Sequence, residues 1–251
     1  FCGESYAAGS LALMERRVGF DPSDLRTTAI RRGETYVIDG TKCLVPLMRH
    51  SPALIVVVSE GTGGGIPGCA AFIVEPTARG VTIEGPEKNM GLNALATYSV
   101  RFEGCEVPAE NRLGAFDYNR LLGLGRIGLA AGAVGVATAV KDYSIAYAKE
   151  RPAFGYPIAT RQTIAFMLAD MAIEVDSCRM LTWKAAWAAD RGDNPQRLAF
   201  LAKGYAAEQS FRIADAGVSI LGGHGLIREH PVEMWFRNAR AFCMLEGLLM
   251  V

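Results

Sequence analysis

The sequence predicts an α+β protein with two domains: an antiparallel β-sandwich or barrel over residues 1–115, followed by an antiparallel four-helix bundle over residues 116–251. Three observations favour this fold class. Short β-rich segments separated by turn residues fill the first part of the chain, and apolar residues at helical spacing fill the second. In addition, 251 residues, half of them hydrophobic, can bury a core large enough to divide into two domains.

The β-rich half contains the candidate strands TYVIDG, ALIVVVSE, CAAFIVEP, GVTIEG and YSVRFEGCEVP, separated by Gly, Pro, Asn or Asp. In the last of them Tyr98, Val100 and Phe102 alternate with polar residues, which predicts one buried and one solvated face. The segment EGTGGGIPG, residues 60–68, predicts a flexible hairpin connection. No GK[ST] or GxGxxG pattern with a following helix is present, so the segment gives little support to a phosphate site.

The first two predicted helices are long. The first ends near Glu150, and Gly128, Gly132 and Gly135 share one of its faces, where another helix could approach closely. The second carries an apolar stripe at alternating spacings of four and three, as in the long helices of bundles. The members of this stripe are Ile164, Leu168, Met171, Val175, Cys178, Leu181 and Ala185.

The third and fourth helices have start and stop signals. Asn194 and Pro195 predict the N-cap and first residue of the third helix, and GGHG, residues 222–225, predicts its end. Pro231 begins the last helix. The short loops between these helices favour an antiparallel bundle.

A single carboxylate, Glu246, lies in the apolar segment AFCMLEGLLMV. If the last helix continues that far, Glu246 extends the apolar stripe formed by Val232, Trp235, Ala239 and Phe242 and points inward, with Gly247 as the helix stop. Burying an ionised carboxylate without partners costs several kcal/mol. The pattern therefore leaves two readings open, a catalytic carboxylate or a helix-end ion pair with Arg237 or Arg240.

Composition limits the classes of partner. Lys plus Arg equals Asp plus Glu, 26 each, so no basic field favours nucleic acid. The six cysteines have no CxxC spacing, and with three histidines they give no metal signature; they indicate reduced thiols in an intracellular protein. The longest apolar run, IGLAAGAVGVATAV, is shorter than the ~20 residues that span a bilayer, so no membrane span is expected.

Several segments together resemble the flavin-dependent acyl-CoA dehydrogenases. They are YAKERPAFGYPI, RQTIAFMLADMAIEVDSCRML, ILGGHGLIREHPVEMWFRNAR and the final LEG, preceded by GETYVIDGTK, FIVEPTARGVTI, KNMGL and VRFEGCEVPAENRLG. The resemblance implies a middle β-domain and a C-terminal helical bundle. It also leads us to expect that the N-terminal helical domain of that family, and a final helix beyond residue 251, are absent from this chain.

The resemblance implies FAD as cofactor and assigns residues to it. Arg151 matches an arginine that reaches the FAD pyrophosphate of a neighbouring subunit, a role suited to a forked, permanently charged donor. Phe154 and Gln162 match contacts at the adenine side, and Gly222 and Gly223 match backbone close to the FAD adenosine part. Without the resemblance, these residues read as surface charge, bundle packing and a helix stop.

The resemblance also implies the chemistry. Glu246 matches the base that removes the α-proton of an acyl-CoA thioester while the β-hydride passes to flavin N5, giving a trans-2-enoyl-CoA. Arg126 matches an arginine near the active site, and Gly247 follows the base at the substrate. Arg126 could instead be a snorkelling residue at a helix end.

Five positions depart from the pattern of the family. Met14 and Arg16 replace residues of its first flavin loop, Leu44 and Pro46 replace a Trp-x-Thr beside the flavin ring, and Leu248 replaces a threonine after the base. These changes remove hydroxyl donors and a stacking face. They put direct flavin contacts in doubt and leave the base in place.

Three functions are therefore compatible with the sequence: an acyl-CoA dehydrogenase, a partner subunit of a heteromeric dehydrogenase that has lost flavin contacts, and an acyl-CoA oxidase. For the dehydrogenase, the resemblance implies an electron-transfer flavoprotein as electron acceptor and a homodimer or homotetramer. The expected compartment is the bacterial cytoplasm or the mitochondrial matrix, with the cytoplasm favoured. Acyl chain length and branching stay open.

Overall fold

A computed structural model describes residues 9–48, 51–60 and 68–246 of the chain. The chain divides into two compact units. Within the described residues, unit 1 contains 9–48, 51–60, 68–89, 93–122 and 246, and unit 2 contains 90–92 and 123–245. The division is not a single cut along the sequence, because a short segment near residue 91 belongs with the helices and Glu246 belongs with the sheet.

Unit 1 is a seven-stranded sheet in which six strands follow the order β1-β4-β2-β3-β7-β6, and the seventh, β5, pairs with β4 outside this path. The strands are β1 (Gly9–Ala12), β2 (Thr28–Arg32), β3 (Thr35–Pro46), β4 (Ala53–Glu60), β5 (Cys69–Val74), β6 (Val81–Glu84) and β7 (Thr97–Pro108), and a 3-10 turn, η3 (Ala109–Asn111), follows β7. The predicted β-domain is confirmed, but the sheet is mixed and not purely antiparallel. Strands β1 and β2 both run parallel to β4. Alternation along a strand specifies its buried face but not the direction of its neighbour, so the sequence could not predict these pairs.

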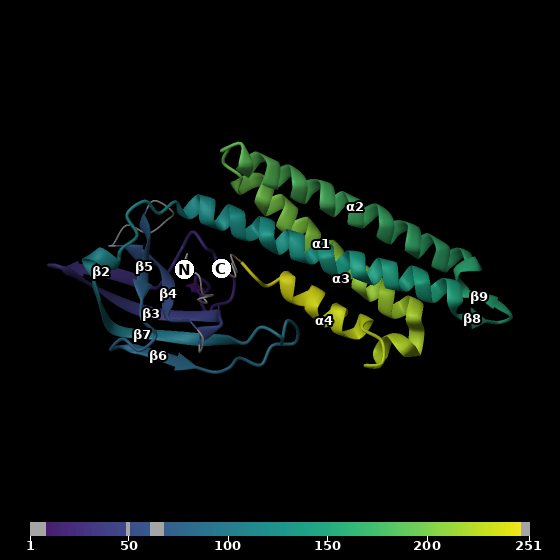
Figure 1. Cartoon of the computed structure of the whole chain (residues 1–251), viewed down its shortest axis with the longest axis horizontal. Helices are drawn as coiled ribbons and strands as arrows, with labels where there is room; N and C mark the ends of the chain where they lie inside the picture. Colours follow the sequence, from purple (N-terminus) through teal and green to yellow (C-terminus); the bar gives the residue numbers. More distant parts are fainter. Residues whose placement is uncertain (1–8, 49–50, 61–67, 247–251) are drawn as a thin grey trace, which may run out of the picture. The chain divides into compact units, whose positions relative to one another are not determined.

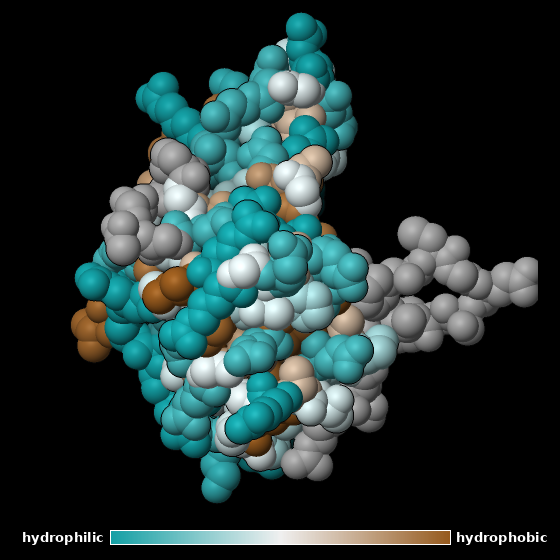
Figure 2. All heavy atoms as spheres, turned by 90° about the vertical axis from the view of Figure 1, so that its left-hand side faces the viewer, coloured by the Kyte–Doolittle hydropathy of each residue, from teal (hydrophilic) through white to brown (hydrophobic). Residues whose placement is uncertain are grey.

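One apolar cluster forms the core of this sheet. Ile38, Val56 and Val100 are fully buried, and the rings of Tyr36 and Phe72 lie 4.8 Å apart, centroid to centroid. Burying each such side chain contributes about 1.5–3 kcal/mol to folding. Viewed from the side of this unit, the surface is mostly hydrophilic with apolar residues in small separate spots, as expected for a solvated sheet domain (Figure 2).

The predicted alternation along β7 is confirmed with one exception. Tyr98, Val100 and Phe102 are buried, and Arg101 is exposed. Ser99 is buried although it belongs to the polar set, because its hydroxyl takes part in a hydrogen-bonded network described below.

The remaining elements form the predicted antiparallel bundle of three long helices and one shorter helix (Figure 1). They are α1 (Tyr118–Glu150), α2 (Gln162–Asp190), α3 (Gln196–Leu221) and α4 (Val232–Phe242), with a hairpin of β8 (Pro152–Ala153) and β9 (Tyr156–Pro157) and the 3-10 turns η4 (Ile158–Thr160) and η5 (Gly222–Leu226) between them. By length and composition alone, α1 could cross a membrane, a test that buried core helices also pass. Alanines and a valine of α1 lie in the core of the bundle, which is the role that the structure gives this helix.

The predicted helix signals are confirmed. Asn194 Oδ1 accepts a hydrogen bond of 3.0 Å from the backbone N–H of Gln196, so Asn194 caps α3. Gly222 ends α3 with a φ of +59°, a conformation that favours glycine. Pro231 immediately precedes α4. The predicted stripe of α2 faces the core, with Met171, Val175, Cys178 and Ala185 buried.

The expected close approach at the glycine face of α1 is found at one of its three glycines. A Cβ added at Gly128 or Gly135 would meet no atom of the described chain within 4 Å, and one at Gly132 would lie 3.1 Å from a ring carbon of Phe242. The tight helix contact is at Gly217 of α3, where an added Cβ would lie 2.5 Å from Val140 Cγ1 of α1. Spacing on one helix identified small residues, but only the partner helix decides which of them are covered.

Candidate functional site

Glu246 does not lie on a helix. The last helix, α4, ends at Phe242. Its final turn is closed by backbone hydrogen bonds between residues three apart, from Cys243 N to the Arg240 carbonyl and from Met244 N to the Ala241 carbonyl. The prediction that Glu246 extends the helical stripe is therefore wrong. The half-buried Glu246 belongs to unit 1, where its backbone N–H donates to Met14 Sδ, 3.4 Å away.

The two arginines considered as helix-end partners of Glu246 have partners of their own in unit 2. Arg237 forms a salt bridge of 2.9 Å with Glu233 and donates to the Met90 carbonyl. The guanidinium carbon of Arg240 lies 5.0 Å from the centre of the Phe211 ring. These contacts fasten α4 to its own unit.

A carboxylate that the sequence did not single out, Glu87, organises the loop around Leu44. Its side chain is 13% exposed and accepts hydrogen bonds from the Leu44 N–H at 3.1 Å, the Thr97 hydroxyl at 2.9 Å and the Ser99 hydroxyl at 3.1 Å. The Arg16 guanidinium lies 3.7 Å from the same carboxylate and donates to Ser99. Leu44 has a φ of +53°, an uncommon conformation for a branched side chain, and the Glu87 carboxylate holds the backbone N–H of that residue.

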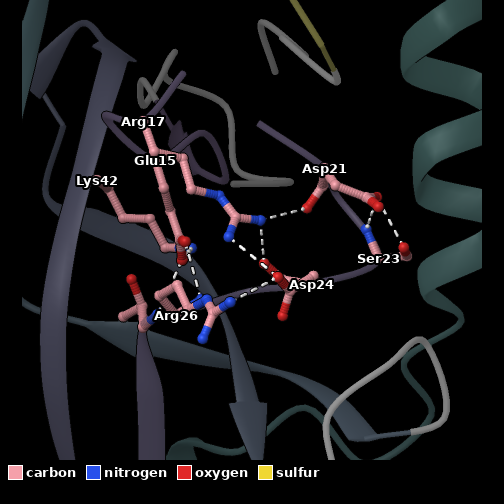
Figure 3. A network of polar contacts seen from close by, with 8 residues as sticks. Glu15, Arg17, Asp21, Ser23, Asp24, Arg26 and Lys42 are labelled. Atoms are coloured by element: carbon pink, nitrogen blue, oxygen red, sulfur yellow. Dashed lines mark hydrogen bonds and ion pairs between the residues drawn. The ribbon is translucent and has the colours of Figure 1, made fainter. Parts of the chain in front are cut away.

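A second carboxylate of unit 1, Glu15, is buried beside Lys42 (Figure 3), and it directly follows Met14 in the sequence. It accepts from the backbone N–H groups of Arg26 and Thr27 and from Lys42 Nζ, each at 2.8–2.9 Å. The Lys42 side chain is fully buried and also donates to the Leu13 carbonyl. The Glu15 carboxylate thus holds together residues from both ends of the loop that follows β1.

Protonation of this pair is set by burial and by the partners. Desolvation lowers the pKa of Lys42 to about 8, because it outweighs the attraction of the Glu15 carboxylate. Burial alone would raise the pKa of Glu15, but the charge of Lys42 and the two backbone N–H donors outweigh it and lower that pKa. Both side chains are therefore charged at neutral pH.

Arg17, next to Arg16, also stabilises the same loop. Its Nη1 lies 3.0 Å from Asp24 Oδ2, and Arg26 Nη2 lies 3.1 Å from the same oxygen (Figure 3). Arg16, at which the chain departs from the family pattern, and its neighbour Arg17 are thus both engaged by carboxylates of unit 1. The three residues that follow Met14 thus all form ion pairs within unit 1.

The five predicted cofactor-binding residues lie at one end of the bundle, where α1 and α3 end and α2 begins (Figure 1). They are Arg151, Phe154, Gln162, Gly222 and Gly223. Phe154 lies in the turn between β8 and β9 with a φ of +55° and 92% of its surface exposed, and the Arg161 guanidinium carbon lies 5.8 Å from its ring centre. Arg151, Gln162 and the two glycines are exposed as well. The structure therefore brings together residues that are up to 72 positions apart in sequence.

Stacked aromatic side chains brace this end of the bundle, and the sequence did not predict them. The Tyr147 hydroxyl lies 2.9 Å from His224 Nδ1, and the Tyr143 hydroxyl lies 2.7 Å from His230 Nδ1. The two imidazole rings stack with centroids 5.2 Å apart, and Trp235 lies edge-on to Tyr143. The only available signal was the spacing of the two tyrosines, which places them on one face of α1. These contacts tie η5, which carries Gly222 and Gly223, to α1 and α4.

Arg126 lies inside the bundle and not at a helix end, so the snorkelling reading is wrong. It is buried, its Nη1 donates to Gln196 Oε1 at 2.9 Å, and its guanidinium carbon lies 5.2 Å from the Phe200 ring centre. These contacts join α1 to the start of α3. A substrate contact by Arg126 stays a prediction. Gly247 and Leu248 lie outside the described residues.

Comparisons with known proteins identify the family. The family profile for "Acyl-CoA dehydrogenase, C-terminal domain" matches residues 116–249, and the profile for "Acyl-CoA dehydrogenase, middle domain" matches residues 10–105. The chain belongs to the acyl-CoA dehydrogenase family. The resemblance stated from the sequence motifs is thereby confirmed.

Individual relatives agree with this assignment. The chain is 36% identical over 243 residues to the caffeyl-CoA reductase-Etf complex subunit CarC of Acetobacterium woodii, an alignment covering 95% of this chain and 64% of that protein. It is 36% identical over 244 residues to the mitochondrial short-chain specific acyl-CoA dehydrogenase of Rattus norvegicus, covering 95% and 59%. The structure of butyryl-CoA dehydrogenase from Megasphaera elsdenii aligns with a TM-score of 0.85 and 33% identity, covering 93% and 63%. The chain thus spans less than two thirds of the length of these relatives.

The residues at the end of the bundle fit the anionic dinucleotide part of FAD. Arg151 offers an exposed forked cation, and a Cβ added at Gly222 or Gly223 would meet no atom of the described chain within 4 Å, so both backbones are open to a ligand. In unit 1, the Leu44 N–H is taken by Glu87, and the buried Pro46 accepts from the Ser10 hydroxyl. Both of these main-chain groups are therefore already engaged within unit 1.

Proposed function

We propose that this chain is the middle and C-terminal part of an acyl-CoA dehydrogenase that converts an acyl-CoA thioester to the trans-2-enoyl-CoA. Membership of the family and 36% identity to a short-chain acyl-CoA dehydrogenase support this activity. The observation that carries the proposal is the contact between Glu246 N–H and Met14 Sδ. It joins the candidate base to the loop that the resemblance assigns to the flavin, although 232 positions separate the two residues.

Glu246 is the proposed base. Its carboxylate accepts the proton from the carbon next to the thioester carbonyl, and its half-buried position limits competition from water. Arg151 reaches the FAD pyrophosphate of a neighbouring subunit, Phe154 and Gln162 contact the adenine side, and the Gly222–Gly223 backbone lies close to the adenosine part. When bound, FAD accepts the β-hydride. Arg126 and Gly247 are the proposed substrate contacts.

The test replaces Glu246 by glutamine in the purified protein. Gln has nearly the same size but cannot accept the proton, so flavin bleaching by an acyl-CoA should slow by ~10²–10⁴-fold while folding and FAD content stay unchanged. Glu106→Gln, which removes an exposed carboxylate from β7 of the same unit, is the matched control and should leave the rate unchanged. Flavin reduction by Glu246→Gln at the parent rate would place the base elsewhere.

A second candidate function is a catalytically impaired partner subunit of a heteromeric dehydrogenase. The apolar side chains of Met14 and Leu44 and the engagement of the Leu44 N–H by Glu87 favour it, because they leave fewer donors for a flavin ring. One relative is itself named as a subunit of a reductase-Etf complex. An absorbance spectrum separates the two functions: a flavin band bleached by an acyl-CoA supports the enzyme, and a colourless protein supports the partner subunit.

The remaining parts of the proposal concern electron acceptor, assembly and compartment. We infer an electron-transfer flavoprotein as acceptor, and oxygen consumption in step with turnover would indicate an acyl-CoA oxidase in its place. We also infer a homodimer or homotetramer. The cysteines of the described residues are free thiols, and the relatives include a mitochondrial protein, which supports the bacterial cytoplasm or the mitochondrial matrix, with the cytoplasm favoured.

A further inference from the structure

Two histidines, His224 of η5 and His230 of the loop before α4, lie ring against ring beside the residues proposed to bind the cofactor. Their centroids are 5.2 Å apart, and the ring planes differ by only 13°. Each ring is held from α1, because the Tyr147 hydroxyl lies 2.9 Å from His224 Nδ1 and the Tyr143 hydroxyl lies 2.7 Å from His230 Nδ1. The two imidazoles, here called the histidine pair, are thus fixed to each other and to one helix.

The histidine pair and a glycine attach η5 to the rest of unit 2. Gly225 lies against α3, where an added Cβ would be 2.4 Å from the Val218 carbonyl oxygen. That contact joins two backbones and contains no titratable group. His224 directly follows Gly222 and Gly223, whose backbones are open to a ligand. The position of this open backbone therefore depends on a permanent contact with α3 and on an ionisable contact with α1.

The charge of the histidine pair decides whether the ionisable contact holds. One protonated ring is compatible with the stack, because the neighbouring ring is uncharged. Two protonated rings with centroids 5.2 Å apart repel each other. In a partly buried site this repulsion disfavours the second proton by roughly 10–100-fold. The closed arrangement of η5 thus binds one proton readily and resists the next.

No carboxylate of the described residues compensates the second charge through an ion pair. Helix α1 presents the two tyrosine hydroxyls, α3 presents backbone, and α4 presents the uncharged ring of Trp235. In the adjoining loop, the side chains of Arg228 and Glu229 are exposed to solvent. On α4, Glu233 is already paired with Arg237 and is also attracted by Arg228. The surroundings therefore leave the repulsion inside the histidine pair in force.

We propose that His224 and His230 are positioning residues for the cofactor-facing backbone of η5 and release it when both rings are protonated. Opening of η5 separates the rings, so the open state takes up the second proton more readily than the closed state. Acidification therefore favours the open state, in the range of about pH 5–8 where histidines change charge. The identity of the ligand rests on the proposed function, whereas the behaviour of the histidine pair rests on contacts within unit 2 alone.

Hydrogen exchange of the η5 peptide in the flavin-free protein tests the histidine pair without the cofactor. After correction for the intrinsic pH dependence of exchange, the protection of η5 should fall by ~10-fold or more between about pH 7 and pH 5, while α2 stays protected. His230→Phe keeps an aromatic ring in the stack but cannot carry a charge, so its η5 should stay protected. His224→Asn also leaves a single imidazole, keeps an acceptor for the Tyr147 hydroxyl, and should stay protected as well.

Tyr143→Phe is the matched control for His230→Phe. It removes the same hydrogen bond but keeps both imidazoles, so the fall in protection should remain. The proposal is overturned if the parent shows no fall, or if both single-imidazole variants, with correct circular dichroism, show the same fall as the parent.

Flavin retention links the histidine pair to the cofactor. In protein loaded with FAD at neutral pH, the flavin lost on gel filtration should increase over the same pH range for the parent and for Tyr143→Phe, and much less for His230→Phe. FAD that is held at neutral pH and released equally by the parent and by His230→Phe would overturn the positioning role. Protein that holds no FAD at any pH would instead contradict the proposed function, which the exchange experiment does not use.

Discussion

Replacing Lys42 by methionine tests whether the buried ion pair holds the loop that carries Met14. Methionine fills most of the same volume but leaves the Glu15 carboxylate, which is 5% exposed, with the two backbone N–H donors of Arg26 and Thr27 and without a counter-ion. Removing one partner of a buried pair costs ~3–5 kcal/mol. We therefore expect a loss of stability of that size in unit 1 at neutral pH.

The assay must report on unit 1 alone. The three tryptophans of the chain lie in α2 and α4, so tryptophan fluorescence follows the bundle. Hydrogen exchange of the peptide that contains the amides of Arg26 and Thr27 follows the loop directly, because both amides are bonded to Glu15. Lys42→Met should raise the exchange rate of these amides and leave the fluorescence transition nearly unchanged.

A pH series tests the ion pair independently, through the direction in which the free energy of unfolding changes with pH. Because burial lowers the pKa of Lys42 from 10.5 to about 8, the unfolded chain binds more protons at this side chain than the folded chain between those two values. The free energy of unfolding should therefore rise with pH in that window, by up to ~3 kcal/mol from this group. Lys42→Met should lack this rise. Lowering the pH through the depressed pKa of Glu15 should remove the stabilisation that this carboxylate contributes above it.

Two variants decide whether the reasoning holds. Glu15→Leu combined with Lys42→Met removes both charges and should be more stable than Lys42→Met alone. Arg212→Met breaks an exposed ion pair on α3 and should cost at most ~1 kcal/mol. The account of the loop is refuted if Lys42→Met costs no more than the surface variant, or if the double variant shows the sum of the single losses.

Three further predictions concern the bundle and the cofactor. Gly217→Ala should destabilise unit 2 by ~1–3 kcal/mol in urea unfolding followed by fluorescence, because the added Cβ has no space. Gly204→Ala, in open space on the same helix, should stabilise the unit by up to ~1 kcal/mol. Equal effects of the two variants would contradict the packing. The hydrogen bond to Glu174 and burial raise the pKa of Tyr205 to about 12, so Tyr205→Phe should abolish the tyrosine absorbance step near that pH. If the step stays unchanged in this variant, it belongs to another tyrosine. Arg151→Ala should lower FAD affinity, and Arg151→Lys should recover only part of it, because a point charge cannot make the forked contact. If Arg151→Ala retains as much flavin as the parent after gel filtration, Arg151 is a surface charge.

Local patterns were sufficient to predict the bundle and insufficient for the sheet order. The start and end of α3 follow from Asn194 and Gly222, whose effects are complete within a few residues of the chain. The parallel neighbours of β4 are contacts between distant segments, and side-chain alternation is the same for either strand direction. The spacing of the glycines on α1 was similarly insufficient, because of the three only Gly132 has a close neighbour in the described chain, and the tighter contact with α1 requires a glycine on the partner helix, at Gly217.

The residues of the candidate site show the same difference between local signals, which were predictable, and contacts between distant segments, which were not. The five residues proposed to bind the cofactor were chosen from motifs, and the structure groups them because helix ends in an antiparallel bundle meet at one end (Figure 1). Glu246 was expected on a helix because the helical spacing of apolar residues was continued beyond Phe242. That spacing does not indicate where the backbone hydrogen bonds of a helix end. Glu87 had no signal, since its three hydrogen-bond donors and its ion-pair partner come from four separate positions between Arg16 and Ser99.

These buried carboxylates explain how the chain can depart from the pattern of its family around Met14 and keep the loop in place. The loop is held through Glu15, whose two oxygens bind Arg26, Thr27 and Lys42, and none of these contacts uses the side chain of Met14. The backbone position of residue 14 is therefore set independently of its side chain. Substitutions at that position change what the loop presents to the Glu246 backbone, a thioether in place of a hydroxyl, without changing where the loop lies. The fold can thus keep the position of Glu246, the proposed base, while the side chain at position 14 varies.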